Sequence, residues 1–104
     1  MSGLNKGEIG QPLRVNIAQD ISAATSAIIL AEPEIGTVKE FVATVPNASV
    51  TVNGVTLEAN EYAEYFTTSE EDLDFTGRWR MKLKATFSAT DVRQTDYVKF
   101  RVND

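Results

Sequence analysis

Residues 78–87 read Arg-Trp-Arg-Met-Lys-Leu-Lys-Ala-Thr-Phe, with an apolar side chain at every second position. A period of two places these side chains on one face of a β-strand, whereas a helix would spread them around its circumference. The pattern predicts a strand with one buried face. Its other face carries Arg78, Arg80, Lys82 and Lys84.

Shorter stretches on the N- and C-terminal sides of this strand also favour extended structure. Asn53-Gly54 is the pair preferred in a two-residue hairpin turn, and apolar residues flank it on one face. The remaining strands are expected within residues 13–18, 27–31, 37–45, 62–68 and 97–102. About seven short strands, separated by turn signals and without a helix, are typical of an antiparallel β-sandwich or a small barrel, and we favour the sandwich.

A length of 104 residues is sufficient for one domain of ordinary size. We expect residues 11–104 to form this single domain. Residues 1–10, rich in small and polar side chains, are expected to be a flexible N-terminal lead-in.

The composition argues against an enzyme. The chain has no cysteine and no histidine, which removes thiolate chemistry, the usual zinc ligands and the commonest general base. We expect no cofactor. The net charge of −5 disfavours nucleic acid as a partner. No apolar run is long enough to cross a membrane and no signal peptide is visible, so we expect synthesis in a cytoplasm.

Three groups of residues resemble a known family. The first is residues 6–15 followed by 20–26, and the second is Glu32-Pro33-Glu34-Ile35-Gly36-Thr37, similar to a "kpdGt" turn but with Ile35 at a position that is usually small and polar. The third is residues 65–79, similar to "sgdLdeaGtW", followed by residues 95–102, similar to "sdpvkFtV". These stretches resemble the small immunoglobulin-like domain of tailed-bacteriophage virion proteins, including the N-terminal domain of baseplate upper proteins.

The resemblance implies an immunoglobulin-like β-sandwich and a structural role without catalytic residues. It implies location in the virion, in contact with other virion proteins and with copies of the same chain on a symmetric scaffold. We expect the tail or baseplate as the location, with decoration of the capsid surface as the alternative.

Two charged stretches are candidate sites. The stripe Arg78, Arg80, Lys82 and Lys84, with Lys99 and Arg101 beside it, is a candidate protein interface; a solvated face and a surface for single-stranded nucleic acid are the alternatives. Residues 58–74 contain seven acidic side chains and no basic one. Three interpretations of this segment are possible: a solvated loop, a Ca²⁺ site, or a counter-surface for the basic stripe of a neighbouring copy.

A function of another class is a carbohydrate-binding adhesion module. Such a module needs exposed aromatic rings, and the candidates are Tyr62, Tyr65 and Tyr97. This hypothesis requires that the three rings be exposed.

Overall fold

The computed structural model describes residues 4–104, which form strands and no helix. The strands are β1 (Leu4–Asn5), β2 (Pro12–Asn16), β3 (Ser26–Pro33), β4 (Lys39–Val42), β5 (Val50–Val52), β6 (Val55–Leu57), β7 (Tyr62–Phe66), β8 (Gly77–Ser88), β9 (Asp91–Gln94) and β10 (Val98–Asn103). The all-β class predicted from the sequence is confirmed. Among the described residues there is accordingly no apolar helix of membrane-spanning length.

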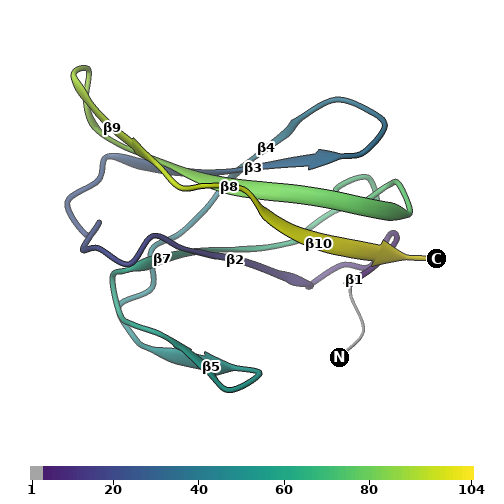
Figure 1. The fold of residues 1–104 in the computed structure, drawn as a ribbon, viewed down its shortest axis with the longest axis horizontal. Coiled ribbons are helices and arrows are strands. Elements are labelled where there is room, and N and C mark those ends of the chain that lie inside the picture. Colours follow the sequence, from purple (N-terminus) through teal and green to yellow (C-terminus); the bar gives the residue numbers. More distant parts are fainter. Residues whose placement is uncertain (1–3) are drawn as a thin grey trace.

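The largest sheet is built around β8, the longest strand. Its order is β1-β10-β8-β3-β4, and β9 pairs with the part of β8 that β10 does not reach. Every pairing is antiparallel except that of β1 with β10. A second sheet, β2-β7, lies against one face of the large sheet (Figure 1). Thr44, which follows β4, pairs with Glu64 of β7 and so links β4 to the second sheet.

The core lies between these two sheets. The alternating apolar residues of β8 point into it, and Leu83 is completely buried. Ile29 of β3 lies opposite Leu83, while Val15 closes the core from the second sheet. Trp79 is 2% exposed, and its indole Nε1–H donates to the carbonyl oxygen of Phe75 at 2.9 Å. The alternation in residues 78–87 therefore predicted the buried face of β8 correctly.

The hairpin predicted at Asn53-Gly54 is also confirmed. Val52 lies opposite Val55, and Asn53 and Gly54 have φ angles of 52° and 80°. Positive φ at both central positions is what a type I′ turn requires, and Asn-Gly supplies it with little strain. The hairpin β5–β6 stands apart from both sheets (Figure 1), and Val55 is 61% exposed. Its apolar face lies outside the main core.

The expected lead-in over residues 1–10 differs from the structure. Residues 1–3 lie outside the described residues. Leu4 and Asn5 pair with β10, and the Gly10 N–H donates to the carbonyl oxygen of Thr67 at 2.7 Å. Residues 4–10 are thus attached to the domain, because their backbone groups find partners that are distant in sequence.

The polar stretch between Ser88 and Thr95 lies outside the strands predicted from the sequence, yet it contains β9. Asp91–Gln94 pairs with the end of β8, and the Arg93 guanidinium lies 4.2 Å from the centroid of the Phe87 ring. Pairing with an existing strand compensates here for the small number of apolar residues.

Thr67 links the second sheet to the segment that precedes β2. It is 1% exposed, and its hydroxyl donates to the carbonyl oxygen of Glu8 at 2.8 Å and accepts from the Gln11 N–H at 2.9 Å. Thr67→Val should lower the free energy of unfolding by about 1–3 kcal/mol, since it leaves two backbone groups without these partners. Urea denaturation measures the change, with the exposed Thr37→Val as the control. A loss no larger than that of the control would contradict the structural role of the hydroxyl.

Candidate functional site

The predicted basic stripe lies on the outer face of the large sheet. Trp79, Met81 and Leu83 of β8 are buried against β2–β7, so the residues between them point to the other side. The structure brings together the four predicted interface residues on that outer face. They are Arg78, Arg80, Lys82 and Lys84.

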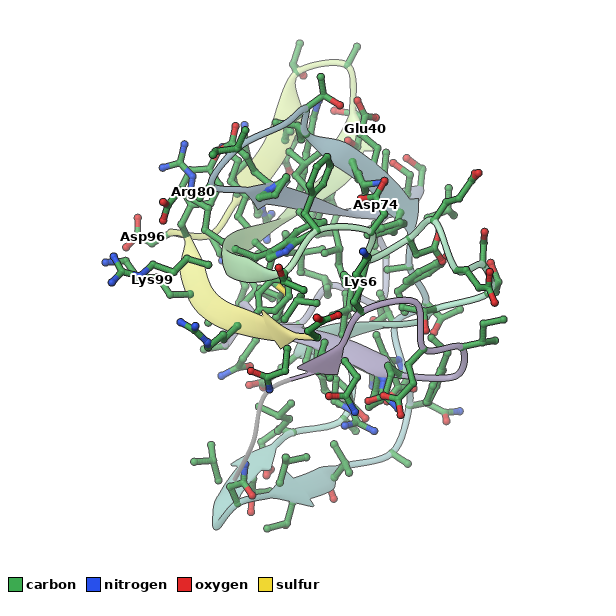
Figure 2. All side chains as sticks on the ribbon, turned by 90° about the vertical axis from the view of Figure 1, so that its right-hand side faces the viewer. Lys6, Glu40, Asp74, Arg80, Asp96 and Lys99 are labelled. Carbon is green, nitrogen blue, oxygen red and sulfur yellow. The ribbon has the colours of Figure 1, made fainter. Side chains whose placement is uncertain are left out.

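The stripe is widened by two cations of β10, as the sequence led us to expect. Lys99 lies opposite Arg80, and Arg101 lies opposite Arg78. Residues directly opposite in an antiparallel pair project from the same face of the sheet. The six cations Arg78, Arg80, Lys82, Lys84, Lys99 and Arg101 therefore share one surface, here called the basic face. Figure 2 shows Arg80 and Lys99 on the side of the molecule away from Asp74.

Arg80 is the cation held most firmly. Its Nη2 lies 2.5 Å from Glu32 Oε1, and its Nε donates to the same oxygen at 2.6 Å. Its guanidinium carbon is 4.0 Å from the centroid of the Tyr97 ring, and Lys82 Nζ is 4.9 Å from that centroid. Contacts with both Glu32 and Tyr97 therefore restrict the guanidinium of Arg80.

The other five cations of the basic face form no ion pair with a carboxylate of residues 4–104. This is notable in a chain of net charge −5. The basic face is consequently a local region of positive charge on an acidic protein, which favours encounter with an acidic surface.

Apolar residues of β3 border the cations. Ile28 lies opposite Lys84 and Leu30 lies opposite Lys82, and all four side chains are half-buried. Lysine stems commonly cover apolar surface in this way while the ammonium stays in water. On the next strand Val42 is 79% exposed. Of the residue types on this surface, arginine and tyrosine are enriched in protein interfaces, whereas lysine is depleted there.

A groove of about 860 Å³ lies at one end of the basic face. The turn after β3 forms one wall and β10 the other, with Arg78 and Arg80 of β8 between them. Its charged lining consists of Glu32, Glu34, Arg78, Arg80, Lys99 and Arg101.

The acidic segment 58–74 does not form one surface. Glu64 pairs with Arg14 at 2.7 Å, and Asp74 pairs with Lys39 at 3.2 Å. The Asp72 carboxylate accepts hydrogen bonds from the N–H groups of Thr68 and Ser69. The remaining acids, Glu58, Glu61, Glu70 and Glu71, stand before and after β7 in the chain. The segment therefore does not offer a continuous counter-surface for the basic stripe of another copy.

No group of three or more potential metal-ligating side chains is found within residues 4–104. The backbone contacts of Asp72 and the ion pair of Asp74 give these carboxylates structural roles in the turn before β8.

The tyrosines do not meet the requirement for a sugar-binding platform. Tyr62 is 2% exposed and donates its hydroxyl hydrogen to the carbonyl oxygen of Ala48 at 3.0 Å. The Tyr65 ring stacks on Phe41, with centroids 4.5 Å apart. Tyr97 is 40% exposed but has Arg80 over its ring.

Tyr65 gives a prediction about stability at alkaline pH. Burial, together with the hydrogen bond to Asp72 and the charge of that carboxylate, raises the pKa of the phenol above its ordinary value. The folded state thus holds this proton more tightly than the unfolded chain. The associated stability is complete below about pH 10 and is lost as the pH rises through the folded-state pKa. Stability measured from pH 9 to 11.5 should fall less steeply for Tyr65→Phe than for the wild type. Equal slopes for the wild type and Tyr65→Phe would contradict the prediction; Tyr97→Phe is the control.

The sequence did not lead us to Glu32 as a member of the site, because we interpreted Glu32 as part of the turn at Pro33. In the structure Glu32 belongs to β3. The alternation of β3 through Ile28, Leu30 and Glu32 was the available signal.

Fold and site together define an all-β protein with a basic, partly apolar outer sheet face. Comparison with models of protein families, with curated proteins and with solved structures found no match.

Proposed function

We propose that this protein is a non-enzymatic structural component of a tailed-phage virion. It docks on other virion proteins, in the tail or baseplate, through the basic face of its large sheet. It is made in the host cytoplasm and acts by shape and charge complementarity, with copies repeated on a symmetric scaffold.

The strand pairing supports an immunoglobulin-like sandwich. In that fold one sheet contains the third, sixth and seventh strands of the sandwich and the other contains the second and fifth. The pairings β3–β8–β10 and β2–β7 are compatible with that arrangement. This is the fold that the sequence resemblance implies.

The residues that carry the resemblance occupy positions where their types matter. Leu73, in the turn that precedes β8, is completely buried. Gly77 has φ of 113°, a conformation that side-chain-bearing residues rarely adopt. Trp79 begins the buried face of β8. These observations support the interpretation that the three residues stabilise the fold. None of the three carries a catalytic group.

The observation that carries the docking role is the basic face itself. Five cations without an ion pair among residues 4–104 share one sheet face with Ile28 and Leu30. An isolated protein gains nothing from like charges placed directly opposite one another, whereas an acidic partner compensates them.

Mass spectrometry of purified particles tests the proposal. Virions from the phage that encodes the chain should contain it in a copy number that fits the symmetry of the tail or baseplate. A copy number in the hundreds would place it on the capsid surface instead. Absence from purified particles would overturn the virion role.

A further inference from the structure

We propose that the groove beside Arg78 binds neighbouring carboxylates on an extended acidic segment of the partner protein. This inference deepens the proposed docking role and rests on it. It identifies which part of the basic face recognises the partner, and by what chemistry.

The groove brings four cations together. Arg78, Arg80, Lys99 and Arg101 form two directly opposed pairs across β8 and β10. Like charges directly opposite each other destabilise a sheet, and only Arg80 has a carboxylate partner among the described residues. An anion bound between the remaining three would remove this repulsion.

The spacing of the cations suits a strand-like ligand. Arg78 and Arg80 are two positions apart in β8, which is about 6.6–6.8 Å along the strand. An extended peptide presents side chains on one face with the same repeat, so acids at positions i and i+2 match the two arginines. The guanidinium fork of Arg78 or Arg101 can bind a carboxylate through two parallel hydrogen bonds.

The groove also holds features that favour a peptide over a nucleic acid. Glu34 lines it beside the cations, its N–H donating to the carbonyl oxygen of Arg78 at 2.8 Å. A uniformly anionic phosphate backbone is repelled by such a carboxylate, whereas a peptide can place a lysine or an amide against it. Single-stranded nucleic acid also relies on open aromatic faces, and Arg80 and Lys82 lie close to the Tyr97 ring.

The test is an NMR titration of the full chain with the synthetic peptide Thr-Glu-Thr-Glu-Thr-Glu-Thr. Amide signals of residues 78–80 and 99–101 should shift, and binding should weaken with added salt. The peptide with glutamine in place of glutamate should produce no shifts. Tighter binding of oligo(dT) than of the acidic peptide would overturn the proposal in favour of a nucleic-acid surface.

Two double variants locate the binding site. Lys99→Gln/Arg101→Gln removes two charges from the groove, and Lys82→Gln/Lys84→Gln removes two from the same sheet face outside it. The first should weaken peptide binding about tenfold or more, and the second less than threefold. Equal losses in both would overturn the groove as the site. Because Lys99 and Arg101 are exposed, the first variant should also fold with an undiminished Tm.

The two proposals fail in different experiments. Particles that incorporate the Lys99→Gln/Arg101→Gln variant at the wild-type level would overturn the groove while leaving the virion role intact. Absence of the wild-type chain from particles would overturn the virion role. The NMR titration measures peptide binding in the groove and does not depend on that role.

Discussion

Replacing Leu83 by alanine lowers the free energy of unfolding by about 2–5 kcal/mol, because the side chain is completely buried at the centre of the core. The substitution removes buried apolar surface and leaves a cavity that Ile29 and Val15 can fill only in part. Domains of about this size have a free energy of unfolding of about 5–15 kcal/mol, so this single substitution removes a large fraction of it.

The measurement is urea denaturation followed by tryptophan fluorescence, since Trp79 is the single tryptophan and lies in the same core. We also expect Tm to fall by at least about 10 °C. Val42→Ala is the matched control, since Val42 is 79% exposed and its loss should change stability by less than about 0.5 kcal/mol. Similar effects of Leu83→Ala and Val42→Ala would contradict the assignment of β8 as the central strand.

Reversing the charge of Arg80 and Lys82 to glutamate has the largest expected effect on docking. Both cations lie in the basic stripe, and glutamates there would face an acidic partner with like charge. Such a juxtaposition costs several kcal/mol, so incorporation into particles should fall about 100-fold or more. Quantitative mass spectrometry of particles assembled with the variant chain measures this loss.

Arg80→Glu also breaks the contact with Glu32, which can disturb the fold. Lys82→Glu/Lys84→Glu leaves that pair intact and should lose incorporation to a similar extent. Lys6→Glu is the control, because Lys6 lies away from the basic face (Figure 2). Undiminished incorporation of folded charge-reversal variants would refute docking through this face.

Much of the fold followed from local patterns. The alternation of residues 78–87 and the Asn53-Gly54 turn specify structure within a few residues, so both were predictable. The pairing of Leu4 with Val102 and of β9 with β8 was not, because neither short stretch carries a strong period of its own. Their strand conformation depends on partners that are placed only when the sheet forms.

The candidate site was predictable to the same degree. The outward direction of Arg78, Arg80, Lys82 and Lys84 follows from the period of a single strand. The contact of Arg80 with Glu32, 48 residues earlier in the chain, depends on the register between two strands. Such a register is set by the packing of the whole sheet, which explains why Glu32 and the groove emerged only in the structure.

Cryo-EM of purified particles tests the central claim most directly. The account predicts density for the chain at symmetry-related positions, with the outer face of β3, β8 and β10 against an acidic surface of a neighbouring virion protein. A map in which this face points to solvent at every position, while another surface makes the contacts, would contradict it.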